Sequence, residues 1–146
     1  MIYIATMRPY GREAEERIRR HHKLRSGKGF ATVECYANLS ESCLGYCDTV
    51  LLEDLGNLAA NELFRPGVTP DGAYRSICVG LENLEARSGH LLVVTSDIFR
   101  DGCSYPVETE AYMRLLGAVN ACAAQRYERV VEIVSGTAVW HKGRQT

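Results

Sequence analysis

The sequence predicts an α/β fold in which helices cover both faces of a mostly parallel sheet. Short apolar runs alternate with longer helical segments, and this alternation implies right-handed crossovers between parallel strands. The chain has 146 residues, of which 46% are hydrophobic, and neither an internal repeat nor a linker divides it. We therefore expect a single α/β domain over residues 1–146.

The first half of the chain predicts three strands and two helices. The strands are short β-branched or continuously apolar runs, at residues 2–6, 31–35 and 49–52. A charged segment without glycine or proline predicts a helix over 12–24, and the Ser-Gly-Lys-Gly sequence at 26–29 ends it. A second helix is expected over 55–64, because Pro66 and Gly67 stop it.

The second half continues the alternation. Apolar residues at helical spacing predict a helix over 73–87, and residues 91–95 form the clearest strand. A long helix is expected over 107–126, with its apolar residues on one side, and residues 130–134 predict a last strand of the sheet. The apolar side of the long helix suits either core packing or an interface between subunits.

Composition excludes several classes of protein. A net charge of −1 argues against a nucleic-acid-binding protein, and no apolar run approaches the ~18 residues of a membrane span. Because Met1 leads directly into Ile-Tyr-Ile-Ala, we expect no signal peptide and a cytoplasmic location. The six cysteines form no C-x-x-C pair, so we expect them to be reduced and mostly buried. No His/Cys spacing resembles a zinc site, and no metal site is predicted.

Positive charge is concentrated near the N-terminus. Residues 8–28 contain eight basic and three acidic side chains, a net charge of +5. One interpretation is a solvated helix face with ion pairs one turn apart, such as Glu13 with Arg17. The other is a binding site for an anion.

His21 lies in this basic segment. Ile18, His21 and Arg25 fall on one helical face, and Arg17 and Arg25 lie one turn on either side of the histidine. A neutral imidazole is a competent nucleophile toward phosphorus, and guanidinium groups can hold phosphate oxygens bidentately. The spacing alone is also typical of an ordinary half-buried surface histidine.

Ordered motifs along the chain resemble a known family. They are Ile-Tyr-Ile-Ala-Thr at 2–6, Glu-Arg-Ile-Arg-Arg-His at 16–21, Arg25, Thr-Val-Glu at 32–34, Val-Leu-Leu-Glu at 50–53, Asn61, Val-Val-Thr-Ser-Asp at 93–97, Gly-Ala-Val-Asn at 117–120, Val-Ser-Gly at 134–136 and Lys142. In this order and spacing, the chain resembles the adenosylcobinamide kinase/adenosylcobinamide-phosphate guanylyltransferase family of cobalamin biosynthesis. The resemblance implies a sheet of the P-loop NTPase (RecA-like) type.

The resemblance also implies an activity. The family phosphorylates adenosylcobinamide and transfers GMP from GTP to the phosphorylated corrinoid through a GMP–histidine intermediate. By register that histidine is His21, with His22 as the alternative. The resemblance further implies GTP and a corrinoid as substrates, Mg²⁺ as a possible cofactor, and a homo-oligomer.

The resemblance assigns the remaining site residues. The implied nucleotide contacts are Ala5, Thr6, Met7, His22, Lys23, Leu24, Arg25, Glu34 and Glu53. Glu34 and Glu53 would accept the N1–H and N2–H donors of guanine or bind the metal. Arg17, Arg25 and Lys28 would hold phosphate.

The sequence departs from the family at two places, in the loop at 95–99, where Thr-Ser-Asp-Ile-Phe replaces the family's Thr-Asn-Glu-Val-Gly, and at its N-terminal end. The family opens with a strand, a glycine-rich P-loop and a helix, but no G-x-x-x-x-G-K-[ST] motif occurs here. We therefore expect the first strand–P-loop–helix to be missing, kinase activity to be lost and a sheet edge to be exposed. The alternatives are a non-catalytic relative that binds nucleotide or corrinoid, a subunit that takes its P-loop from a separate chain, and a misplaced start codon.

Overall fold

The structure is a computed structural model that describes residues 1–42, 44–98 and 105–143. Its main sheet has four strands, β1 (Ile2–Ala5), β2 (Ala31–Glu34), β3 (Cys47–Glu53) and β4 (Ser88–Val94), in the order β2-β1-β3-β4. Every neighbouring pair in this sheet is parallel. The expected α/β fold with a parallel sheet is therefore confirmed.

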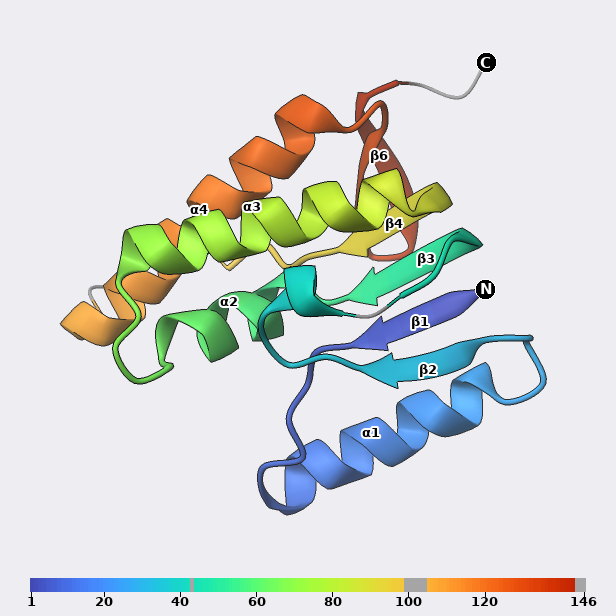
Figure 1. The fold of residues 1–146 in the computed structure, drawn as a ribbon, viewed down its shortest axis with the longest axis horizontal. Helices are drawn as coiled ribbons and strands as arrows, with labels where there is room; N and C mark the ends of the chain where they lie inside the picture. The colour runs from blue at the N-terminus through green and yellow to red at the C-terminus, as the bar shows by residue number, and fades with distance from the viewer. Residues whose placement is uncertain (43, 99–104, 144–146) are drawn as a thin grey trace.

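Among the described residues, four α-helices accompany the sheet, and Figure 1 shows how they lie against it. They are α1 (Gly11–Arg25), α2 (Leu55–Leu63), α3 (Pro70–Ala86) and α4 (Val107–Arg126), and a single 3-10 turn, η1 (Leu39–Glu41), follows β2. Helix α3 starts three residues earlier than expected because Thr69 caps it: the Thr69 hydroxyl accepts a hydrogen bond from the Gly72 amide, and Pro70 occupies the first turn.

The helices lie on opposite faces of the sheet because side chains alternate along each strand. Ile4, Val50 and Leu52 point to one face and form the core with α2, α3 and α4. Tyr3 points to the other face, where the guanidinium of Arg25 from α1 lies over its ring. The two faces are thus built differently, since α1 contains no buried residue whereas α2, α3 and α4 supply most of the core.

The apolar side of α4 packs into this core. Leu115, Leu116 and Val119 are 4%, 0% and 0% exposed and belong to the same cluster as the sheet residues. Of the two roles that the sequence allowed for this apolar side, the structure shows core packing.

The prediction of a last strand within the main sheet is wrong. β5 (Val130–Val134) pairs with β6 (Thr137–Lys142) in a separate antiparallel hairpin. Ser135 and Gly136 connect them with φ values of 49° and 84°, and a two-residue hairpin turn requires such positive φ angles. The Ser-Gly turn reverses the chain at this point and gives β5 an antiparallel partner in β6.

Strands β2 and β4 are the two edges of the main sheet. On β4, Leu92 and Val94 are 52% and 42% exposed. Within the described residues, no helix is long and apolar enough to cross a membrane.

The described cysteines differ from expectation in their burial. Cys35, Cys47, Cys78 and Cys122 are free thiols, as expected, but each is half-buried rather than buried. Cys43 and Cys103 lie outside the described residues.

Candidate functional site

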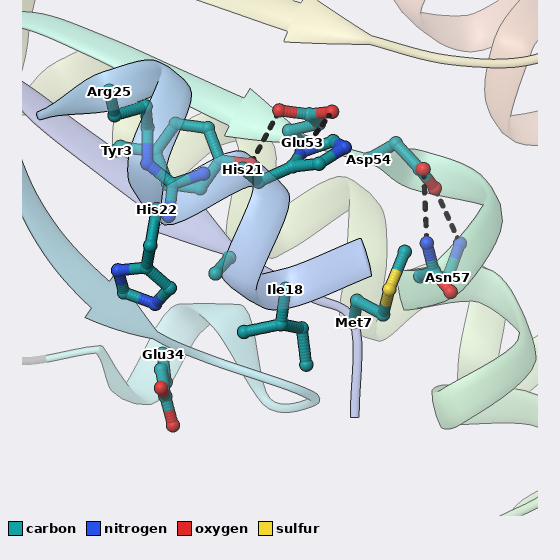
Figure 2. A pocket seen from close by; sticks show the side chains of 11 residues that line it. Tyr3, Met7, Ile18, His21, His22, Arg25, Glu34, Glu53, Asp54 and Asn57 are labelled. Atoms are coloured by element: carbon teal, nitrogen blue, oxygen red, sulfur yellow. Dashed lines mark hydrogen bonds and ion pairs between the residues drawn. The ribbon is translucent and has the colours of Figure 1, made fainter. Parts of the chain in front are cut away.

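A pocket lies between α1 and the carboxyl ends of three parallel strands (Figure 2). Its lining residues are Tyr3, Ala5, Met7, Ile18, His21, His22, Arg25, Glu34, Glu53, Asp54 and Asn57. Ala5, Glu34 and Glu53 end β1, β2 and β3, and the sheet register places Ala5 between the two glutamates. The crevice at the carboxyl ends of parallel strands is where open α/β sheets bind their ligands.

Glu53 connects α1 to the sheet. One carboxylate oxygen, Oε1, lies 3.2 Å from Nδ1 of His21, and the other, Oε2, accepts a hydrogen bond from the Tyr3 hydroxyl. Figure 2 shows both contacts as dashed lines. Because a carboxylate accepts, the neutral ring carries its proton on Nδ1 and presents an unprotonated Nε2. Glu53 therefore selects the tautomer of His21 that can act as a nucleophile.

Arg25 covers Tyr3. Its guanidinium carbon lies 3.5 Å from the centre of the tyrosine ring, a cation–π contact. Burial, followed by the hydrogen bond to Glu53, raises the pKa of the Tyr3 hydroxyl, so this hydroxyl stays protonated and donates. Among the described residues, the buried Nε of Arg25 has no hydrogen-bond partner.

Glu34 and His22 form the opposite side of the pocket. The Tyr36 hydroxyl donates to Oε2 of Glu34 at 2.6 Å, and this hydrogen bond, with burial second, raises the pKa of Tyr36 to about 12. His22 points away from Glu53 in Figure 2. The two histidines of α1 are therefore not equivalent, since only His21 has a carboxylate partner of this kind.

The junction of β3 and α2 completes the wall. Asp54 caps α2: Oδ1 accepts from the Asn57 amide at 2.7 Å, and Oδ2 accepts from Nδ2 of Asn57 at 3.0 Å. The buried Thr6 also stabilises this junction, because its hydroxyl oxygen accepts a hydrogen bond of 2.7 Å from the Asp54 amide. The amide of Asn61 donates to the Thr6 carbonyl at 2.8 Å and fixes the end of β1 to α2.

Most of the site residues expected from the sequence gather in the pocket. Those that line it are Ala5, Met7, His21, His22, Arg25, Glu34 and Glu53. Thr6 is fully buried and does not line it. Arg17, Lys23, Leu24 and Lys28 are exposed and lie outside its lining.

Three lining residues were not expected from the sequence, namely Tyr3, Asp54 and Asn57. Asp54 and Asn57 carried a usable signal, because an Asp three residues before an Asn at the end of a strand is typical of a helix N-terminus. The role of Tyr3 depends on its contact with Glu53, which only the pairing of β1 with β3 creates.

The pocket is tight. Its cavity volume is about 30 Å³, close to the space that one water molecule occupies in the liquid. The two carboxylates nearest His21 are engaged, Glu53 by Tyr3 and His21 and Asp54 by Asn57, and the described residues contain no group of three potential metal ligands. These residues do not present a ready set of Mg²⁺ ligands.

A parallel sheet with helices on both faces and a site at its carboxyl ends defines an α/β protein, and this arrangement is consistent with a P-loop NTPase-like fold. The model of one such family, described as cobinamide kinase / cobinamide phosphate guanyltransferase, matches residues 1–140, and the chain belongs to this family. The family acts in cobalamin biosynthesis on small-molecule substrates such as cobinamide and GTP. No curated protein gives a significant match to the chain.

Proposed function

We propose that this protein is a guanylyltransferase in which Nε2 of His21 becomes guanylylated. The observation that carries the proposal is the contact of 3.2 Å between Nδ1 of His21 and Oε1 of Glu53. It leaves Nε2 as the available nucleophile on the side of the ring away from the carboxylate. The family match supplies the substrate class, a guanosine nucleotide and a phosphorylated corrinoid.

The proposed reaction has two steps. In the first, Nε2 attacks the α-phosphorus of GTP, a P–N bond forms, and the bond to the β-phosphate oxygen breaks to release pyrophosphate. In the second, a phosphate oxygen of adenosylcobinamide phosphate attacks the same phosphorus, and the P–N electron pair returns to Nε2. The proton on Nδ1 stays beside Oε1 of Glu53 throughout, and the carboxylate stabilises the positive charge of the substituted ring.

Entry of a whole nucleotide requires α1 to move from the sheet, because ligand pockets are typically ~300 Å³ or larger. The structure supports such a movement, since α1 has no buried residue and few apolar contacts hold it. Arg25 then exchanges its contact with Tyr3 for a phosphate, and Glu34, which lines the pocket, accepts hydrogen bonds from the guanine edge.

The kinase reaction is proposed to be absent from residues 1–146 acting alone. These residues contain no P-loop motif to supply backbone N–H groups and a lysine to the β- and γ-phosphates. We also propose that Ala5, Met7 and His22 contact the bound GTP.

Incubation with GTP labelled at the α-phosphate tests the proposal. We expect an acid-labile adduct that is lost in His21→Ala and retained in His22→Ala, which is the matched control from the same helix. An adduct that survives His21→Ala and disappears in His22→Ala would assign the nucleophile to the neighbouring histidine. Absence of an adduct in every variant would overturn the proposed reaction.

The tight pocket favours a second candidate, a family relative that binds nucleotide or corrinoid without catalysis. Calorimetry with GTP, GMP and cobinamide distinguishes the two. Binding of GTP without an adduct would favour the second candidate, and no heat with any of the three would exclude both.

A further inference from the structure

Two thiols face each other on the side of the sheet opposite the pocket. Cys78 of α3 and Cys122 of α4 have their Sγ atoms 3.6 Å apart, and both side chains are half-buried. Cysteines this close on two packed helices need only small side-chain rotations to reach the ~2.05 Å length of a disulfide bond. Neither residue lines the site described above.

The surrounding contacts hold α3 and α4 at this spacing. Arg126, one turn after Cys122, forms ion pairs with Glu82 and Glu85, which lie one and two turns after Cys78. Ile77 and Ala123, next to the two cysteines, are buried. These contacts therefore fix the positions of the two thiols relative to each other.

A tyrosine hydroxyl completes the cluster. Tyr74 lies one turn before Cys78, and its interactions with the thiols of Cys122 and Cys78 raise the pKa of its own hydroxyl to about 12. Burial, followed by the hydrogen bond to Cys122, raises the pKa of Cys78 to about 11, whereas the hydrogen bond from Tyr74 lowers it. Since the thiolate is the attacking species, the reaction of this pair accelerates with rising pH, and Tyr74 favours it.

We propose that Cys78 and Cys122 form a reversible disulfide that clamps α3 to α4. The oxidant is a low-molecular-weight disulfide such as oxidised glutathione. One protein thiolate attacks it, forms a mixed disulfide and releases one glutathione thiolate. The second protein thiolate then attacks the protein sulfur of the mixed disulfide, closes the Sγ–Sγ bond and releases the second glutathione thiolate. The two protein thiol protons end on the two released glutathione molecules. The protein thiols are thereby oxidised by two electrons, and the glutathione disulfide is reduced by the same two electrons.

Mass spectrometry of the whole chain tests this modification. After incubation with oxidised glutathione and alkylation under denaturing conditions, we expect the number of alkylated thiols to fall from six to four. Trypsin should then release peptides 76–87 and 115–126 joined by a bond that a reductant cleaves, since each contains one cysteine. The oxidised protein should melt roughly 5–10 °C higher than the reduced protein.

Three variants make the test specific. Cys122→Ser lacks the second thiol, so it should form no link between peptides 76–87 and 115–126, keep any glutathione on Cys78 as a mixed disulfide, and show no increase in melting temperature. Cys47→Ser, which removes a thiol hydrogen-bonded to the Thr49 carbonyl and not paired with Cys78 or Cys122, should form the 76–87 to 115–126 link like the wild type. Tyr74→Phe should slow the link about two- to tenfold at neutral pH. In the wild-type chain, six alkylated thiols after oxidation, a stable glutathione adduct, or a link between other peptides would overturn the proposal.

Discussion

Nδ1 of His21 lies 3.2 Å from Oε1 of Glu53, and this contact joins the last turns of α1 to the carboxyl end of β3. The two residues come from different regions of the sequence and meet because β1 pairs with both β2 and β3 beneath α1. Tyr3 holds the second oxygen of the same carboxylate. The proposed nucleophile is thus oriented by groups from two strands and one helix.

Glu53→Gln should reduce the rate of adduct formation roughly ten- to a hundredfold, because the amide holds the His21 ring without stabilising positive charge on it. Single-turnover labelling with α-labelled GTP measures this rate. Tyr3→Phe keeps the ring beneath Arg25 and removes only the hydrogen bond to Glu53, so a smaller loss is expected. Equal rates in wild type and Glu53→Gln would exclude an orienting role for Glu53.

Thr6→Val should destabilise the fold by about 1–3 kcal/mol, because the Asp54 amide loses the buried oxygen to which it donates at 2.7 Å. Thr6→Ser retains the hydroxyl and should recover most of this loss. Urea denaturation followed by circular dichroism measures both variants. A Thr6→Val protein as stable as the wild type would show that the hydroxyl does not hold the junction.

Glu62→Ala should cost about 3–5 kcal/mol of unfolding free energy. Glu62 is 1% exposed, and its carboxylate accepts hydrogen bonds from Arg65, Ser76 and the Asn38 amide. Its loss leaves these groups without a shared acceptor. Glu16→Ala, which breaks an exposed pair with Arg12, is the matched control and should change stability by less than about 1 kcal/mol.

Gly80→Ala should destabilise the protein by about 1–3 kcal/mol, since a Cβ at this position would lie 2.6 Å from Cβ of Leu39. Leu39 is fully buried in the turn after β2 and cannot move aside without moving the backbone. Thermal melting compares this variant with Arg75→Ala on the exposed side of α3. If both alanine variants melt at the wild-type temperature, the close packing of α3 against Leu39 is wrong.

Tyr127→Phe should raise stability by about 1 kcal/mol, because the buried Tyr127 hydroxyl has no hydrogen-bond partner among the described residues. Burial raises the pKa of Tyr127 to about 12, above its unfolded value of 10. As the pH rises, the unfolded chain therefore releases the Tyr127 proton before the folded chain does. The free energy of unfolding is unaffected by this group below pH 10 and falls between pH 10 and 12. Denaturation measured across this range should show that the free energy of unfolding falls less steeply with pH in Tyr127→Phe than in the wild type. The same slope in both proteins would contradict this prediction.

The alternation of apolar runs and helical segments predicted the four-stranded parallel sheet, because each of these elements has a strong local signal. It failed at residues 130–134, where an apolar run is equally compatible with a central strand and with a hairpin. Whether such a run becomes a central strand or part of a hairpin depends on the strand with which it pairs. Here the turn at Ser135 and Gly136 pairs β5 with β6.

The candidate site was predictable to the extent that it depends on motifs and helical spacing. Ile18, His21 and Arg25 were placed on one face of a helix by their spacing, and the structure shows all three lining the pocket. The same spacing placed Arg17 beside the histidine as a phosphate ligand, whereas it is exposed outside the lining. Spacing along a helix predicts which residues share one face of that helix. It does not predict which face packs against the sheet.

The sequence by itself determined the order of the main elements, the family and the histidine-bearing helix, because these rest on local patterns and ordered motifs. Only the tertiary structure decided that Glu53 contacts His21, that Arg25 covers Tyr3 and that two distant thiols face each other. Strand register and helix packing bring these pairs together across long separations in the chain. Local residue patterns carry no information about such contacts, which arise only when the sheet and its helices assemble.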